Sequence, residues 1–230
     1  ARDRGWPGRA PGDLPAQVVW GRKHRAARRL QGRPRVSFRR SFYKGRRYPS
    51  LSEPAHTFFA AASRGVAPLL SAELRDLGAG DVERTGAGAS FTGSLETGYK
   101  VCLWSRMASR VLLQLARVDA ATADALYEGV VSLPWTDHMA PTGTLAVNFN
   151  GTSTEIRNSH FGALRVKDAV VDHFREAHGS RPSVDTDQPD LRIDVHLYKT
   201  EAVVSVDLSG GGLHRRGYRG SATEAPLKEN

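Results

Sequence analysis

The sequence predicts an α/β protein made of two consecutive modules. From His56 onwards, short apolar runs with a period of two alternate with stretches whose period is about 3.6 residues, the patterns of strands and helices. A chain of 230 residues is long enough for one large domain or two small ones. No run approaches the roughly 18 apolar residues of a membrane-spanning helix, so we expect no transmembrane segment.

The first module is predicted to follow the element order β-α-β-β-α-β, which is the ferredoxin-like arrangement. Its patterns predict strands at 56–62, 81–85, 89–92 and 110–118 and a helix at 67–77. Pro68 marks the start of that helix and Gly78 its end. A second helix is marked by Leu95, Tyr99, Cys102 and Leu103.

The second module follows without a long linker. It is predicted to contain helices at 122–131 and 161–178 and strands at 144–150, 191–199 and 201–208. In the longer helix, one apolar face is formed by Val166, Val170, Phe174 and Ala177. In the strand at 191–199 the apolar residues alternate with Arg192, Asp194 and His196, which we expect to point outward.

The basic charge of the chain lies in its N-terminal segment. Residues 1–55 hold 15 Lys and Arg against 3 Asp and Glu, a net charge of +12, whereas residues 56–230 hold 18 against 21, a net of −3. We expect residues 1–55 to be a disordered extension, or translated sequence upstream of the true start, although their aromatic residues are also suited to stacking on RNA bases. Any RNA-binding role of the body must therefore rest on local patches.

The sequence offers no catalytic, metal-ligating or cofactor-binding residues. The single cysteine, Cys102, forms no internal disulfide, which indicates a reducing compartment, and we expect the protein in the cytoplasm. The glycine clusters lack the spacing of nucleotide-binding loops, and His173 and His178 do not share a helix face. Asp185, Asp187 and Asp190 lack the glycine and glutamate of a calcium loop.

Two local clusters are the candidate RNA-binding sites. The first surrounds a predicted helix N-terminus, whose free N–H groups attract phosphate, and contains Arg157, Asn158, Ser159, Arg165 and Lys167. A plain N-cap role for Asn158 or Ser159 is the alternative. The second follows the last strand on a glycine-rich segment and contains His214, Arg215, Arg216, Tyr218 and Arg219. Its alternative is a solvated linker.

Long segments of residues 57–229 resemble the N-terminal part of the bacterial bifunctional 23S rRNA guanine methyltransferases, the large subunit K/L type. The matching segments are FFAAASRGVAPLLSAEL (58–74), LWSRMASRVLL (103–113), IRNSHFGALRVKDAVVDHF (156–174), RPSVDTDQPDLRIDVHLYK (181–199) and DLSGGGLHRRGYRGSATEAPLKE (207–229). The resemblance implies a ferredoxin-like part at 56–105, a THUMP RNA-binding domain at 97–208 that shares elements with it, and a linker at 209–230.

The resemblance further implies that this region binds 23S ribosomal RNA and presents a guanine for N2 methylation by a downstream methyltransferase domain. In the family, S-adenosylmethionine binds a glycine-rich loop in that domain, and an Asn-Pro-Pro-Tyr segment holds the target amino group. Neither motif occurs before Asn230, so we expect this chain to hold no cofactor and to be non-catalytic by itself. Two alternatives stay open: a THUMP module of a tRNA methylation or thiolation enzyme, and a ferredoxin-like regulator that binds a small ligand.

Overall fold

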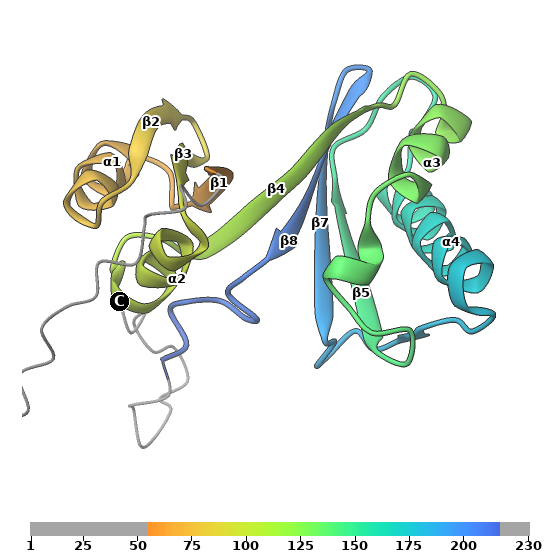
Figure 1. The fold of residues 1–230 in the computed structure, drawn as a ribbon. Helices are drawn as coiled ribbons and strands as arrows, with labels where there is room; N and C mark the ends of the chain where they lie inside the picture. Colours follow the sequence, from red (N-terminus) through yellow and green to blue (C-terminus); the bar gives the residue numbers. More distant parts are fainter. Residues whose placement is uncertain (1–54, 217–230) are drawn as a thin grey trace, which may run out of the picture. The chain divides into compact units, whose positions relative to one another are not determined.

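The computed structural model describes residues 55–216 (Figure 1). The strands are β1 (His56–Ala61), β2 (Gly80–Thr85), β3 (Gly88–Gly93), β4 (Arg110–Asp119), β5 (Thr144–Asn150), β6 (Ser183–Val184), β7 (Leu191–Tyr198) and β8 (Glu201–Asp207). The helices are α1 (Ala67–Asp76), α2 (Leu95–Trp104), α3 (Ala123–Val131), the 3-10 helix η1 (Trp135–Asp137) and α4 (Ser159–His178). Apart from η1 and β6, which were not predicted, these elements agree closely with the predicted ranges, and the first six follow the predicted ferredoxin-like order.

All the described strands join one sheet in the order β2-β3-β1-β4-β8-β7-β5-β6. The long strand β4 pairs with β1 along one edge and with β8 along the other, antiparallel in both cases. β5 and β7 pair in parallel, which requires the crossover that α4 supplies. The two predicted modules are therefore halves of one sheet that share β4.

The four α-helices cover one face of this sheet. In the first half, α1 and α2 bury Leu70 and Val101 against Phe58 of β1, which stacks on Phe91 of β3. In the second half, α3 and α4 lie against β5, β7 and β8 (Figure 1), and buried residues of these helices and strands form the second core. Leu113 of the first core lies directly opposite Val206 of the second, so both cores lie on the same side of the sheet.

The local sequence explains where the helices begin. Thr122 and Asn158 are N-caps whose side-chain oxygens accept hydrogen bonds from Ala125 N and His160 N, and they fix the first turns of α3 and α4. α4 ends at Gly179, whose φ of 67° is the left-handed conformation that favours glycine. These caps act within a few residues, which is why the sequence patterns locate the elements well.

Two apolar faces differ from the expectation. Ala177 was expected on the buried face of α4, but it is exposed, and Val171 is buried instead. In α2, three of the four residues that mark the helix, Leu95, Tyr99 and Leu103, are exposed, whereas Cys102 is half-buried against the first core. Gly98 and Val101 face the core in their place, because only a residue without a side chain fits under the ring of Phe58.

Candidate nucleic-acid interface

The first predicted cluster lies at the N-terminus of α4. Asn158 caps the helix through its side-chain oxygen, 2.8 Å from His160 N, so the N-cap role is observed. Ser159 and His160 are exposed in the first turn. Arg157 is held by a 2.8 Å hydrogen bond from its Nε to Thr154 O, while its side chain remains exposed to solvent. An exposed guanidinium beside free helical N–H groups forms a seat suited to phosphate.

The two other basic residues of this cluster have partners within the protein. Arg165 forms an ion pair with Asp124 of α3, and its guanidinium lies 4.4 Å from the centre of the Tyr127 ring. Lys167 pairs with Asp168 at 2.7 Å. Arg165 therefore attaches α4 to α3, and both cations are less available to a ligand than Arg157.

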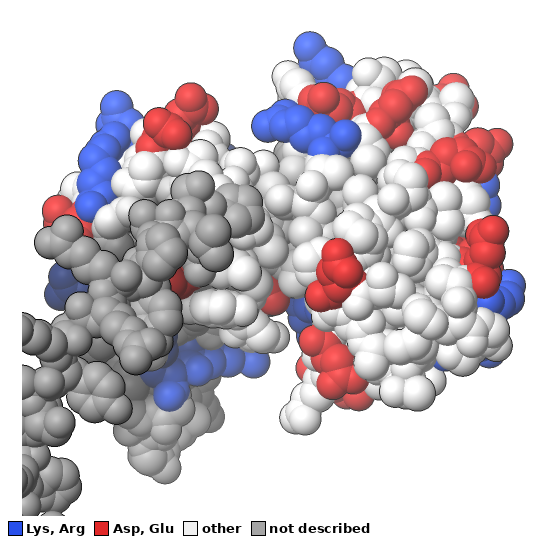
Figure 2. Space-filling model, in the orientation of Figure 1, with Lys and Arg blue, Asp and Glu red and all other residues white. Residues whose placement is uncertain are grey.

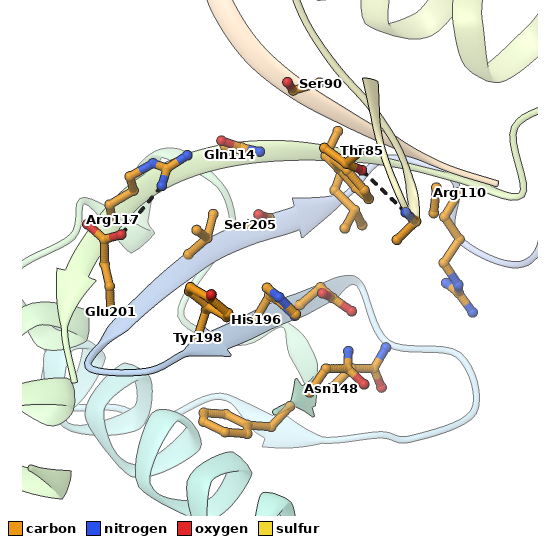
Figure 3. A pocket seen from close by; sticks show the side chains of 18 of the residues that line it. Thr85, Ser90, Arg110, Gln114, Arg117, Asn148, His196, Tyr198, Glu201 and Ser205 are labelled. Carbon is orange, nitrogen blue, oxygen red and sulfur yellow. Dashed lines mark hydrogen bonds and ion pairs between the residues drawn. The ribbon is translucent and has the colours of Figure 1, made fainter. Parts of the chain in front are cut away.

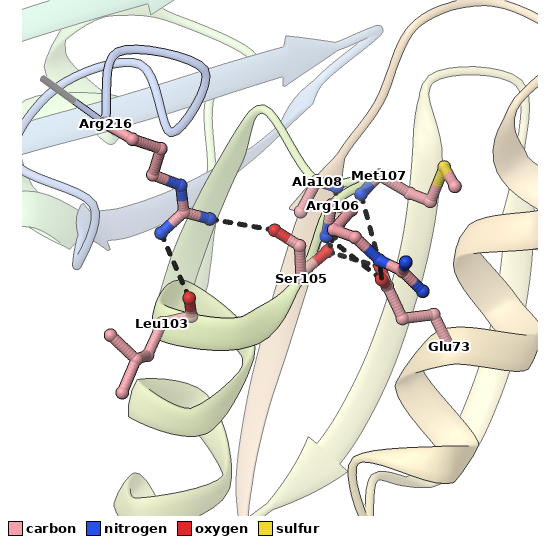
Figure 4. A network of polar contacts seen from close by, with 7 residues as sticks. All are labelled: Glu73, Leu103, Ser105, Arg106, Met107, Ala108 and Arg216. Carbon is pink, nitrogen blue, oxygen red and sulfur yellow. Dashed lines mark hydrogen bonds and ion pairs between the residues drawn. The ribbon is translucent and has the colours of Figure 1, made fainter. Parts of the chain in front are cut away.

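The second predicted cluster packs against α2, not against α4. Arg216 donates hydrogen bonds to the carbonyl oxygens of Cys102, Leu103 and Ser105 at 2.9, 3.1 and 2.8 Å (Figure 4). These are the free carbonyls at the C-terminus of a helix, where a cation is favoured. Arg215 is exposed, whereas Tyr218 and Arg219 lie outside the described residues.

His214 and Cys102 lie close to this anchor. The Nδ1 atom of His214 is buried and has no hydrogen-bond partner among residues 55–216. Burial, and to a lesser extent the nearby Asp207 carboxylate, raises the pKa of the Cys102 thiol to about 11. Cys102 is therefore a protonated thiol at neutral pH.

A third polar surface, which the sequence did not predict as a site, is the helix-free face of the sheet. It borders a hollow of about 1070 Å³ that runs from β2 to β5 and reaches the first turn of α4. Across the middle of this face, Gln114, Ser205, Asp194 and Asn148 lie in register on β4, β8, β7 and β5. Figure 3 shows Gln114, Ser205, His196 and Tyr198 on this same face.

The electrostatics of this face are mixed. Arg110 forms an ion pair with Asp207, whose side chain is only 1% exposed, and Arg117 lies 3.5 Å from Glu201. The pKa of Asp194 is raised, first because the carboxyl is largely buried and second because Asp207 lies nearby. Each arginine is thus matched by a carboxylate, and the floor of the hollow carries no excess positive charge.

One feature of the sequence pointed to this polar face of the sheet. Asp194 and His196 were expected to point outward from their strand, and they do. Outward polar residues on a strand are common on solvated sheets, however, so the pattern alone did not indicate a site. What the sequence could not show is that four such positions from four strands lie side by side.

Charge is dispersed on the face of the described residues that Figure 2 shows. Lys and Arg side chains are interspersed there with Asp and Glu, without a continuous basic patch. This agrees with the net charge of −3 for residues 56–230. A long-range electrostatic attraction to RNA is therefore not a property of the body, and contacts must be local.

Residues 55–216 contain neither a membrane-spanning helix nor a cluster of metal ligands. None of the helices there combines the length and the hydropathy that a bilayer crossing requires. No group of three or more His, Cys, Asp or Glu side chains in the same residues is arranged to hold a metal ion.

Comparisons with known proteins agree with this architecture. Residues 57–112 match the RlmL ferredoxin-like domain and residues 120–207 match the THUMP domain. The chain is therefore a ferredoxin-like domain followed by a THUMP domain, which share one sheet.

The curated relatives and the solved structures make the assignment more specific. The ribosomal RNA large subunit methyltransferase K/L of Syntrophotalea carbinolica is 56% identical over 173 residues, which are 75% of this chain and 24% of the relative. The protein of that name from Methylococcus capsulatus is 53% identical over 173 residues, 75% of this chain and 23% of the relative. Over about three quarters of its length the chain is thus similar to proteins named ribosomal RNA large subunit methyltransferase K/L.

Solved structures show the same fold in longer proteins. A predicted N6-adenine-specific DNA methylase of Listeria monocytogenes aligns with a TM-score of 0.65 and 27% identity, over 76% of this chain and 46% of that one. SMU.472, a putative methyltransferase complexed with SAH, gives a TM-score of 0.65 at 28% identity with the same coverage of both chains. This chain spans about a quarter of the length of the curated relatives that it matches.

Proposed function

We propose that this chain is the RNA-binding N-terminal portion of an S-adenosylmethionine-dependent 23S rRNA (guanine-N2)-methyltransferase. The observation that carries the proposal is the identity of 56% over 173 residues with a ribosomal RNA methyltransferase. In this function the ferredoxin-like and THUMP domains hold ribosomal RNA in the cytoplasm, and a downstream methyltransferase domain modifies it. The single cysteine, which cannot form an internal disulfide, fits a reducing compartment.

The α4 N-terminus is the RNA contact that the geometry supports best. Arg157, Asn158 and Ser159 together supply an exposed cation and the first turn of a 20-residue helix. Arg165 and Lys167 would have to leave Asp124 and Asp168 to reach a phosphate, so we assign them a smaller contribution. Arg215 is exposed and suited to a second phosphate, with Tyr218 and Arg219 proposed to extend that contact.

S-adenosylmethionine is proposed to bind in the methyltransferase domain and not in residues 55–216. In that part of the chain the Gly86–Gly88 turn joins two antiparallel strands, and the glycines at 210–212 do not lead into a helix. A cofactor cradle of the usual kind needs a glycine-rich loop between a strand and a helix. The described residues therefore do not fit the cofactor.

The proposal is tested by filter binding of the 230-residue chain to 23S rRNA fragments over a range of salt concentrations. Arg157→Ala should weaken binding and reduce the salt slope by about 1, because one phosphate contact is lost. The matched control is Arg175→Ala, which removes a cation that pairs with Asp172 near the other end of the same helix. An unchanged slope for Arg157→Ala, together with a loss for Arg175→Ala, would place the RNA on a different surface.

Transfer RNA is the necessary competitor in this assay. It tests the alternative, left open by the sequence, of a THUMP module in a tRNA methylation or thiolation enzyme. Preferential binding of 23S fragments over tRNA supports the proposal. Equal or tighter binding of tRNA would instead support a THUMP module of a tRNA-modifying enzyme, and binding of neither RNA would favour a small-ligand regulator.

A further inference from the structure

The helix-free face of the sheet carries a row of polar side chains that can form hydrogen bonds. Pairing of the strands through their backbones does not require polar side chains at these positions. Gln114, Ser205, Asp194 and Asn148 form one row across four strands. Adjacent strands lie about 4.8 Å apart, so the row extends over roughly 14 Å. The row places amide, hydroxyl, carboxyl and amide groups side by side on the floor of the hollow of about 1070 Å³.

The open floor of this hollow favours a polymer over a single small molecule. Small-molecule pockets are mostly enclosed and have volumes of about 300–1,000 Å³. Here the volume is at the upper end of that range, but the floor is an open sheet whose central row is polar and whose flanking positions, such as Val147 and Val203, are apolar. An extended ligand that lies along the sheet fits such a surface better.

The charges on the floor favour a base over a phosphate. Arg110 and Arg117 are paired with Asp207 and Glu201, so neither is a free cation. Asp194 lies at the centre of the row, where its carboxyl group is hydrogen-bonded by the Asn148 side chain and lies near Arg110 and His196. A carboxylate only accepts hydrogen bonds, and it therefore repels phosphate oxygens but binds N–H donors.

Guanine is the base whose edge matches this row best. Its N1–H and N2 amino groups are two adjacent donors, which one carboxylate accepts together, while Gln114 or Asn148 donates an amide N–H to the O6 acceptor. Adenine offers only its N6 amino donor on that edge. Proteins recognise unpaired bases in this way, through their Watson–Crick edges and by stacking.

Stacking partners lie along the same strand. His196 and Tyr198 follow Asp194 at alternate positions of β7, and both are exposed. Lys199 lies 5.3 Å from the centre of the Tyr198 ring, so a cation accompanies this aromatic face. At the opposite rim, Ser159 and His160 of α4 border the hollow, next to the proposed phosphate seat. An RNA strand can thus keep its phosphates at the rim and turn its bases inward.

We infer that the helix-free face, centred on Asp194, binds an unpaired guanine of single-stranded RNA. The inference rests on the proposed RNA-binding function and adds a base preference to it. The guanine is bound here and not modified.

The test measures base preference with the full 230-residue chain and labelled six-nucleotide RNAs. These are oligouridylates with guanine, inosine or adenine at the third position, and binding is followed by fluorescence anisotropy at fixed salt. The wild-type chain should prefer guanine over adenine by about tenfold or more, the range expected for a paired base contact. Inosine, which lacks the N2 amino group, should fall between them. Because the preference is a ratio of two affinities, the contribution of the basic segment 1–55, which does not depend on the base, cancels.

Asp194→Asn is the decisive variant, because it keeps the size of the side chain and removes the charge. It should abolish the guanine preference while circular dichroism stays unchanged. Glu176→Gln, an exposed position of α4, removes the same charge elsewhere and should leave the preference intact. An Asp194→Asn chain that binds all three RNAs more tightly by the same factor would show that Asp194 only repels phosphate, and this would overturn the inference.

The remaining outcomes separate the two proposals. Equal binding of all three RNAs by the wild-type chain overturns the guanine site but leaves the RNA-binding function standing. No binding of any RNA, including 23S fragments, contradicts both. Binding of free guanosine monophosphate as tightly as the guanine hexamer would show that the site takes a nucleotide and not an RNA strand.

Discussion

Glu73 is the side chain that connects the two helices of the first half. Its carboxylate accepts hydrogen bonds from Ser105 Oγ at 2.6 Å, Arg106 N at 3.0 Å and Met107 N at 3.2 Å (Figure 4). These donors lie in the turn between α2 and β4. Arg216 binds the carbonyl groups at the same helix end, so this turn is fixed from two sides.

At the residue scale we therefore predict that Glu73→Ala destabilises the protein by about 2 kcal/mol or more, because donors in the turn lose a charged acceptor. For a chain of this length that is a fall in the melting temperature of roughly 4–8 °C. Glu73→Gln should cause a smaller loss of stability than Glu73→Ala, since its amide keeps one acceptor oxygen. Thermal unfolding followed by circular dichroism measures both. The control is Asp76→Ala, at an exposed position of the same helix; an equal loss there would contradict the assigned role.

Arg216 fits both an RNA-binding role and a structural role. It was expected to face RNA, yet it donates three hydrogen bonds to the end of α2. An alanine at this position therefore alters the fold as well as any RNA contact. Arg157 is the cleaner probe of RNA binding, because its one described hydrogen bond is to the nearby Thr154 carbonyl.

At the scale of the element, α2 is shaped by a glycine. A Cβ atom at Gly98 would lie 2.7 Å from Cε1 of Phe58, a fully buried ring. The apolar residues Leu95, Tyr99 and Leu103 are left on the exposed side of the helix. The helix thus packs through Gly98 and Val101 and not through Leu95, Tyr99 and Leu103.

We predict that Gly98→Ala lowers the free energy of unfolding, although alanine is the better helix former by about 1 kcal/mol. The overpacking cost of about 1–3 kcal/mol exceeds that gain in most of its range. Urea denaturation measures the change. Phe58→Leu removes the ring, so the double variant should lose less stability than the sum of the two single variants. Additive losses would mean that the ring and the glycine do not interact.

At the scale of the whole described body, β4 is common to both halves. Leu113 contributes to the first core and lies opposite Val206 of the second, and all the described strands belong to one sheet. Neither half can release β4 without exposing the core of the other. The two domains are therefore expected to unfold together.

This coupling is tested by placing a mutation in one core and a probe in the other. Leu74→Ala, in the first core, should cost about 2–5 kcal/mol. The probe is Trp135, which is fully buried in the second core, with the other tryptophans replaced by phenylalanine. We expect its fluorescence transition in urea to shift to lower concentration together with the circular dichroism transition. If the Trp135 transition remains at the urea concentration found without the mutation, the two halves unfold independently.

The sequence by itself determined the elements and the order in which they occur. The alternation in β5, β7 and β8 and the caps Thr122 and Asn158 act over a few residues, so their effects can be predicted without knowing the fold. The family resemblance, which the comparisons confirm, rests on the same linear order.

Only the tertiary structure decided which of the polar residues are available to bind RNA. Arg165 meets Asp124 across 41 positions, Arg110 meets Asp207 across 97, and Arg216 meets Ser105 across 111. The row from Gln114 to Asn148 likewise exists only because β4, β8, β7 and β5 pair in one register. A periodic pattern reports which side of a strand is apolar, but it contains no information about which strand lies beside it. That choice depends on contacts between distant segments, and it changed which residues we propose as the RNA interface.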